Sequence, residues 1–200
     1  MYADPLARRF YNRNVALVSR QLLGRHLIHE SPEGTTVGRI VEVEAYLPEG
    51  DPACHGAKGQ TRRNQSIFGP PGHAYVYAIH SRWCLNAVAE PEQVGCAALI
   101  RAVEPLEGIE LMQARRQREK LLELARGPGR LCQAFGIAKP LDGWDLTLGE
   151  KLWIAATPRP LAKSEVVSVS PRIGVTSAHE LLLRFFLAGN RWVSGKRFTT

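Results

Sequence analysis

Apolar and polar residues alternate along several stretches of the chain, and this spacing predicts β-strands. Two of these stretches, residues 26–29 and 37–46, are separated by the turn-forming residues Ser31-Pro32-Glu33-Gly34, which predicts a hairpin. The other predicted strands are 73–79, 95–103, 152–154, 173–175 and 184–187. A sheet is therefore expected at the centre of the fold.

Helical spacing of apolar residues is confined to a few segments. It predicts a helix over residues 13–24, ending at Gly24. Pro105 is expected to open a second helix that runs to about Ala125 and stops at Gly127-Pro128-Gly129, before a short helix from Arg130. This order of elements predicts one α+β domain over residues 1–200, with helices around a curved, largely antiparallel β-sheet.

Composition adds a preference for polyanionic partners. The chain carries a net charge of +7, with 44% hydrophobic and 22% charged residues, which is typical of a globular protein that binds nucleic acid, although solubility alone also explains such a charge. An anionic membrane surface or an acidic protein is an alternative partner. The first residues, MYADPLARRF, lack the apolar core of an export signal, and no apolar run is long enough to cross a membrane. We expect a soluble protein of the cytoplasm (associated with the nucleoid in a bacterium), without a membrane partner.

The cysteines do not indicate a disulfide framework or a metal site. Cys54, Cys84, Cys96 and Cys132 form no CxxC pair, and a chain of 200 residues does not need disulfides to fold. The pair Cys54-His55 lacks the second cluster that a structural zinc requires. We expect reduced core thiols, no metal and no cofactor.

The segment Gly38–Tyr46, GRIVEVEAY, is the most informative for chemistry. On a strand, Glu42, Glu44 and Tyr46 point to one face, immediately before a long loop of Gly, Pro and Arg residues over 48–72. Loops of this length in a compact domain are usually functional. Two carboxylates beside such a loop suit general-base chemistry, whereas taken alone they favour a solvated outer face.

Two further segments carry candidate side chains. Tyr75 and Tyr77 share a strand face with His73 and Ile79, so they form either a stacking wall for a flat ligand or ordinary half-buried core. Arg101 lies within an apolar strand and needs a carboxylate partner, either Glu44 or the nearby Glu104 and Glu107.

Together these segments resemble the alkyladenine DNA glycosylase family, the purine-type 3-methyladenine DNA glycosylases. The matching motifs, in the order of the family, are GRIVEVEAYL, DPACHG with KGQTRRN, PGHAYVYAIH, CLN at 84–86, ALIRAVEPLEG, GPGRLCQAFGI and RFFLAGNRWVSG. They span roughly residues 7–195, and their joint occurrence is far more specific than any one of them.

The resemblance implies a monofunctional base-excision-repair glycosylase that binds damaged double-stranded DNA as a monomer. It implies that Glu44 is the general base that activates a water and that Arg101 helps to hold that water and the base. The implied substrates are purines such as 3-methyladenine, 7-methylguanine, hypoxanthine and ethenoadenine. The remaining implied roles are base binding by Tyr46, His55, Tyr77 and Asn86, and DNA-backbone contacts by Arg130 and the 61–64 loop with Thr61 and Arg63.

One position departs from the family pattern. His80 stands where the family carries a tyrosine that fills the gap left by the flipped base, and Arg82 is placed to share that role. No lysine falls within the pocket motifs, the nearest being Lys58 in the loop, so we expect water as the nucleophile and no Schiff-base step. The alternatives are a noncatalytic damaged-DNA binding protein, and a metal-dependent hydrolase that uses Cys54, His55 and His73.

Overall fold

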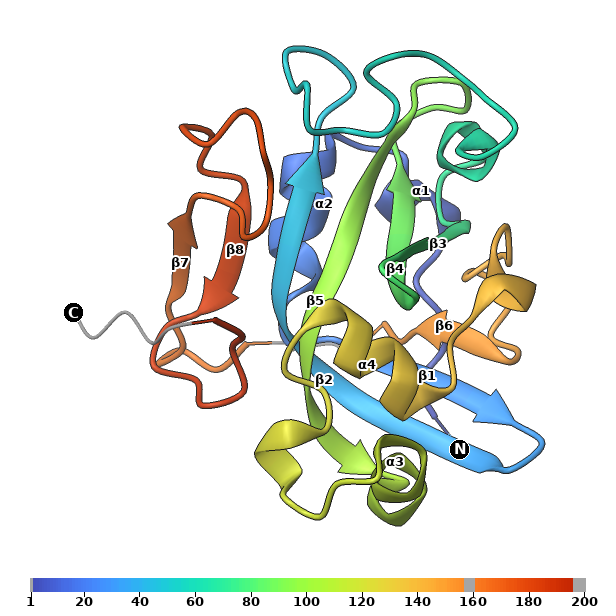
Figure 1. Ribbon diagram of the computed structural model, residues 1–200, viewed down its shortest axis with the longest axis vertical. Coiled ribbons are helices and arrows are strands. Elements are labelled where there is room, and N and C mark those ends of the chain that lie inside the picture. The colour runs from blue at the N-terminus through green and yellow to red at the C-terminus, as the bar shows by residue number, and fades with distance from the viewer. Residues whose placement is uncertain (1, 157–160, 196–200) are drawn as a thin grey trace.

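The computed structural model describes residues 2–156 and 161–195, and within them eight strands form one curved antiparallel sheet (Figure 1). The order along the sheet is β3-β4-β5-β2-β1-β6, while β8 pairs with β2 and carries β7 on its other side. The strands are β1 His26–Ser31, β2 Gly34–Tyr46, β3 Ala74–Ile79, β4 Arg82–Ala89, β5 Cys96–Glu107, β6 Leu152–Ile154, β7 Val167–Ser170 and β8 Arg184–Leu187. This confirms the predicted α+β class.

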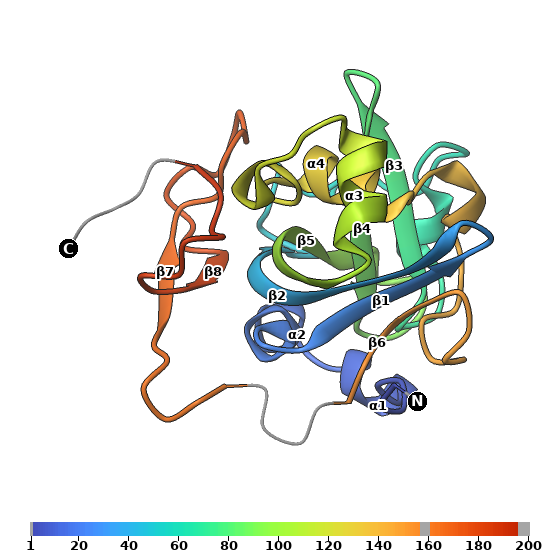
Figure 2. The same cartoon turned by 90° about the horizontal axis from the view of Figure 1, so that it is seen from below.

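Helices cover both sides of the sheet. Helices α1 and α2 lie on one side, and α3 and α4 lie on the other, whereas β7 and β8 form a ribbon beside the main body (Figure 2). The helices are α1 Arg8–Tyr11, α2 Val15–Leu22, α3 Ile109–Arg116 and α4 Pro128–Phe135. Short 3₁₀ turns lie at Gln65–Phe68, Leu121–Glu123 and Lys139–Leu141. No helix in the described part of the chain is long and apolar enough to span a membrane.

The central strand β2 is the element on which the sheet is built. Its first half pairs with β1 through the predicted hairpin, with Ser31 opposite Gly34, and its second half pairs with β8. Along most of its length it also pairs with β5. Strand β2 has neighbours on both edges, and helices lie on both sides of the sheet (Figure 2), so the side chains of residues 40–45 are all fully buried.

An irregularity in the pairing of β2 with β5 changes the direction of one side chain, that of Arg101. Ile40 is opposite Val103, but the register then shifts between Ile40 and Glu42 and again between Glu42 and Val43, so Val41 and Arg101 have no ladder partner. Bulges of this kind bend strands and redirect side chains beside functional sites. Here the shift places Arg101 next to the two glutamates of β2.

The predicted helix over 105–125 is wrong in both its start and its length. Pro105 continues strand β5 opposite Gly38, and the helix begins only after Gly108, which adopts φ +71°. It ends at Arg116, because Gln117 takes a left-handed conformation with φ +52°. Strand pairing thus overrides the preference of proline for the first turn of a helix.

Other boundaries were predicted with mixed success. The strands at 152–154 and 184–187 are present with the predicted bounds, and the helix at 13–24, the strands at 26–29, 73–79 and 95–103 and the helix near Arg130 are present with shifted ends. The strand predicted at 173–175 is wrong, because these residues form an irregular loop, and strands β4 and β7 and helix α1 were not predicted. All four cysteines are buried free thiols, as expected.

Candidate active site

Glu42 and Glu44 are completely buried, so the solvated outer face that the pattern alone favoured is wrong. Alternation along a strand shows which residues share a face, but not whether that face is covered. Here the β7–β8 ribbon and the segment around Ser194 cover it. Two buried carboxylates require charged or hydrogen-bonding partners, and the neighbouring elements supply them.

Glu44 accepts three hydrogen bonds. Its Oε2 accepts from Arg101 Nη1 at 3.1 Å and from the Tyr46 hydroxyl at 3.0 Å, and its Oε1 accepts from the Ile173 backbone N–H at 2.7 Å. An ionised carboxylate offers about four lone-pair directions, two on each oxygen. The hydrogen bonds from the described residues therefore fill Oε2 and leave one direction on Oε1 for a further donor such as water.

Glu42 accepts hydrogen bonds from Arg101 and from a second arginine, Arg184. Its Oε1 accepts from Arg101 Nε at 3.0 Å, from Arg184 Nε at 2.7 Å and from the Ser194 hydroxyl at 2.9 Å, while its Oε2 accepts from the Ser194 N–H at 2.7 Å. Two glutamates and two arginines thus balance each other in a cluster almost without exposure to water. The expected Arg101–Glu44 pair is confirmed, and Glu42 is a second partner that the sequence did not indicate.

Burial sets the acidity of Glu44. The loss of hydration raises the pKa of this carboxyl above its ordinary value, although the charge of Arg101 and the hydrogen bonds from Ile173 and Tyr46 act in the opposite direction. A carboxylate with a raised pKa is a stronger base than an exposed one, and it needs a higher pH to stay ionised.

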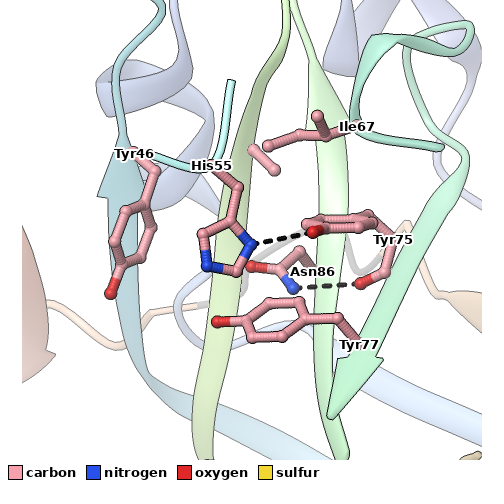
Figure 3. Close-up of a pocket in the computed structure, with 7 residues that line it drawn as sticks. Tyr46, His55, Ile67, Tyr75, Tyr77 and Asn86 are labelled. Atoms are coloured by element: carbon pink, nitrogen blue, oxygen red, sulfur yellow. Dashed lines mark hydrogen bonds between the residues drawn. The ribbon is translucent and has the colours of Figure 1, made fainter. Parts of the chain in front are cut away.

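Tyr46, which donates to Glu44, also lines an aromatic pocket (Figure 3). Tyr46, from the end of β2, lines one side, and His55, from the following loop, stands between Tyr46 and the tyrosines of β3. His55 meets the Tyr77 ring at a centroid distance of 4.4 Å, and Tyr77 stacks on Tyr75 at 5.1 Å. The cavity measures about 10 Å³, which is room for about one water molecule, so a larger flat ligand would fit only if these rings moved apart.

His55 is held by Tyr75. The His55 Nδ1 and the Tyr75 hydroxyl lie 2.8 Å apart, and Tyr75 is only 3% exposed. Burial raises the pKa of Tyr75, so its hydroxyl keeps its proton. Among the described residues, the acceptor for this proton is His55 Nδ1. Burial and the charge of Arg63 lower the pKa of His55. We infer a neutral ring that carries its proton on Nε2.

Asn86 forms the floor of the pocket from strand β4. Its side-chain amide donates to the Tyr75 backbone carbonyl at 2.9 Å, and the residue is 3% exposed. This bond fixes the orientation of the amide group. The structure thus brings Glu44, Arg101, Tyr46, His55, Tyr77 and Asn86 into one site.

The predicted DNA contacts lie on the surface instead. His80 is exposed at the tip of the β3–β4 hairpin, where it and Ser81 both adopt left-handed backbone angles of φ +46° and +62°. Arg82 follows in β4, and a Cβ on Gly129 at the start of α4 would lie 2.9 Å from the Arg82 Cβ. The hairpin and the amino end of α4, which carries the exposed Arg130, are therefore neighbours.

More positive charge gathers at this surface. The pKa of Arg116 is lowered by partial burial and by the charges of Arg130, Arg118 and Arg82. Like charges gathered in this way create a positive potential that suits a polyanion.

The 61–64 loop is ordered by its own hydrogen bonds. The Asn64 Oδ1 accepts from the Thr61 backbone N–H and hydroxyl, while its Nδ2 donates to the carbonyls of His55 and Gly59. Thr61 therefore shapes the loop and also connects it to the pocket histidine through Asn64. Arg63 is exposed.

Comparison with known proteins identifies the family. Residues 9–191 match the family model of methylpurine-DNA glycosylase. The chain belongs to the methylpurine-DNA glycosylase family. A relative from Methanoculleus marisnigri is 49% identical over 187 residues, covering 92% of this chain and 96% of its own, and one from Rubrobacter xylanophilus is 52% identical over 171 residues, covering 85% and 87%. Both carry names that assign them provisionally as 3-methyladenine DNA glycosylases, as does a relative from Paraburkholderia phytofirmans, 46% identical over 195 residues, covering 96% and 89%.

The metal-hydrolase alternative finds no support in the geometry of this methylpurine-DNA glycosylase family member. The Cys54 thiol contacts the Gly95 carbonyl, His55 contacts Tyr75, and His73 lies 3.5 Å from Asp145. Within residues 2–156 and 161–195 no group of three or more His, Cys, Asp or Glu side chains is placed to hold a metal ion.

Several residues of the site were not assigned from the sequence. Tyr75 was named only as part of a possible stacking wall, although it also orients His55. Ile173 acts through its backbone N–H, which no sequence pattern reveals, and Arg172 and Asp51 form a buried ion pair across 121 residues. The sequence signal that could have indicated this pair is the single charged residue among small and apolar residues in each of the segments GDPA and SPRIG.

The buried cluster predicts a large loss of stability on substitution of Glu42. In Glu42→Gln, Arg101 and Arg184 lose a charged partner in a region without water, so we expect the free energy of unfolding to fall by about 3–5 kcal/mol. Glu33→Gln weakens the surface pair of Glu33 with Arg115 and is the control, expected to cost less than about 1 kcal/mol. Urea denaturation measures both, and equal costs would contradict the account.

Proposed function

We propose that this protein is a monofunctional DNA glycosylase that flips alkylated or deaminated purines out of duplex DNA and hydrolyses their glycosidic bonds. The proposed substrates are 3-methyladenine, 7-methylguanine, hypoxanthine and ethenoadenine. The observation that carries the proposal is Glu44, a buried carboxylate with one open lone-pair direction, bonded to the tyrosine that walls an aromatic pocket. Membership of the methylpurine-DNA glycosylase family and the names of the relatives support it.

The base would reach this pocket by extrusion. A base inside the duplex is inaccessible, so the enzyme must spend a few kcal/mol on unstacking it. Insertion between Tyr46 on one side and His55 and Tyr77 on the other would recover about 1–3 kcal/mol of stacking energy. Alkylated purines that carry a positive charge gain additional cation–π attraction to these rings.

Glu44 would then serve as general base. A water on the open side of Oε1 gives up a proton to the carboxylate as it attacks C1′ of the nucleotide. The transition state resembles an oxocarbenium ion, which the negative charge of Glu44 also stabilises. Arg101 fixes the carboxylate through Oε2 and is proposed to help hold the water and the base.

The lesion decides how the purine leaves. 3-Methyladenine and 7-methylguanine are cationic in DNA and depart without a further proton, whereas neutral hypoxanthine needs one. The inferred Nε2–H of His55 is a donor for an acceptor atom on the flipped base. Asn86, fixed by Tyr75, is proposed to crowd the exocyclic amino group of normal guanine.

The surface residues would hold the DNA around the flipped nucleotide. The β3–β4 hairpin, with His80 at its tip and Arg82 beside it, is proposed to fill the gap in the base stack. Arg130, Arg63 and Thr61 are proposed to contact the phosphate backbone, where positive charge supplies most of the affinity. We propose that the protein acts without a cofactor, as a monomer, on the DNA of the cytoplasm.

The proposal predicts that Glu44→Gln abolishes turnover but keeps DNA binding. The change removes the proton acceptor and the negative charge while preserving size, so we expect the rate of base release to fall at least about a thousandfold. Single-turnover release of 3-methyladenine and hypoxanthine from duplex DNA, in EDTA, measures the rate, and a binding titration with the same duplex measures affinity.

Two outcomes would contradict this assignment. If neither base is released by the unaltered protein while damaged DNA is still bound, the noncatalytic binding protein is the better description. If borohydride traps a covalent DNA adduct, a lysine Schiff base replaces water as the nucleophile.

The β3–β4 hairpin generates a prediction that distinguishes an effect on base flipping from an effect on hydrolysis of the glycosidic bond. Besides His80, the tip presents Ile79, whose side chain is 46% exposed and shares a strand face with Tyr77. Replacing His80 by alanine should slow release from duplex DNA about tenfold, as expected for the loss of 1–2 kcal/mol of stacking. Release from single-stranded DNA, which has no gap to fill, should not change. Ile79→Ala is the matched variant at the same tip. An equal loss of release rate on duplex and on single-stranded DNA would exclude a wedge at this tip.

A further inference from the structure

Arg172 and Asp51 form an ion pair that is completely buried. Two contacts of 2.6 Å join them, from Nη1 to Oδ2 and from Nη2 to Oδ1, and neither side chain has any exposure. The cost of removing two charges from water makes such a pair weak support for a stabilising role in itself. Its neighbours suggest what else it does.

The pair joins the end of β2 to the start of the pocket loop. Asp51 accepts from the Leu47 N–H at 3.0 Å and from the Ala53 N–H at 3.1 Å, while Arg172 Nη1 donates to the Ala45 carbonyl at 3.0 Å. These backbone groups flank Tyr46 on one side and lead to His55 on the other. The position of both pocket side chains thus depends on the same two charges.

Arg172 also contacts the pocket wall and the general base. Its guanidinium carbon lies 4.5 Å from the centroid of the Tyr46 ring, and Arg172 does not line the pocket, so it covers the side of the ring away from the cavity. The next residue, Ile173, donates its N–H to Glu44 Oε1 at 2.7 Å. Arg172 Nε has no hydrogen-bond partner among the described residues, so the plane of the guanidinium is set by Asp51, the Ala45 carbonyl and the Tyr46 ring.

We propose that the Asp51–Arg172 pair is a positioning device that aligns Glu44, Tyr46 and the His55 loop with one another. This rests on the proposed function, because it assigns the pair to the step in which Glu44 activates water. Neither residue contacts the reacting atoms. Arg172 acts through the Ile173 amide and the Tyr46 ring, and Asp51 acts through Arg172 and the backbone of residues 47–53.

The direction of the effect on Glu44 follows from the hydrogen bonds. The Ile173 N–H and the Tyr46 hydroxyl both favour the ionised form of Glu44 and lower its pKa against the effect of burial. If the pair is weakened and these donors shift, the pKa of Glu44 rises further. The acid side of the pH–rate profile then moves to higher pH, which a loss of general stability would not produce.

Asp51→Asn tests the proposal against a matched control. The chain contains another two-point arginine–carboxylate pair, in which Arg39 donates to Glu165 at 2.8 and 2.6 Å. Among the described residues, Glu165 accepts a further hydrogen bond from the Ala162 N–H rather than from a residue of the site. Glu165→Gln therefore makes the same carboxylate-to-amide change elsewhere. Single-turnover release of 3-methyladenine is measured from pH 5 to 9, together with DNA affinity and thermal unfolding.

We expect Asp51→Asn to slow base release about tenfold to a hundredfold, as small misalignments of catalytic groups do. Its acid limb should move to higher pH while DNA affinity stays unchanged, and Glu165→Gln should match the unaltered protein in rate and pH profile. If Asp51→Asn has no cooperative unfolding transition, Arg172→Lys, which keeps the opposite charges, is tested by the same measurements.

The outcomes are distinct. No base release by the unaltered protein would refute the proposed function itself. Release by the unaltered protein, with a folded Asp51→Asn or Arg172→Lys variant that keeps the original pH profile, would refute the positioning role alone. Failure of both variants to fold would also reject it, because the pair would then be needed for stability rather than for alignment.

Discussion

The structure depends on one buried arrangement of charges, in which Arg101 lies between Glu42 and Glu44. Each carboxylate lacks water, so its negative charge is sustained only by donors from the protein. Those donors come from β5, from β8 and from the segment of Ser194. Glu44 therefore has its hydrogen-bond partners only when the sheet is complete, because segments distant in sequence supply them.

The aromatic pocket is connected to this cluster through shared hydrogen bonds. Tyr46 both lines the pocket and donates to Glu44, and Tyr75 holds His55 on the opposite side of the cavity. The rings of His55, Tyr77 and Tyr75 contact one another. Entry of a flat base must therefore move the same side chains that contact the general base, which couples recognition of the lesion to catalysis in the proposed mechanism.

Much of this fold follows from local patterns, and the reason for each failure is physical. The hairpin of β1 and β2 was predicted because alternation and turn residues act over short distances. Pro105 was placed in a helix because its strand partner, Gly38, is remote in sequence. Alternation placed Glu42 and Glu44 on one face but could not show that a ribbon beginning more than a hundred residues later covers them.

The site was predicted unevenly for the same reason. Motif resemblance supplied Glu44, Arg101 and the ring residues, and the structure brings them together. The Ile173 amide and the register shift at Arg101 depend on backbone conformation, which side-chain identity does not encode. Their discovery required the three-dimensional structure.

The central claim is that a buried, ionised Glu44 activates the attacking water. The most direct measurement is the pH dependence of single-turnover release of 3-methyladenine, a base that departs without needing a proton. The account predicts that the rate falls on the acid side with a midpoint above the pKa of an ordinary glutamate, and that the residual rate of Glu44→Gln lacks this limb. A profile of the unaltered protein that stays flat through this range, or one that Glu44→Gln shares, would contradict it.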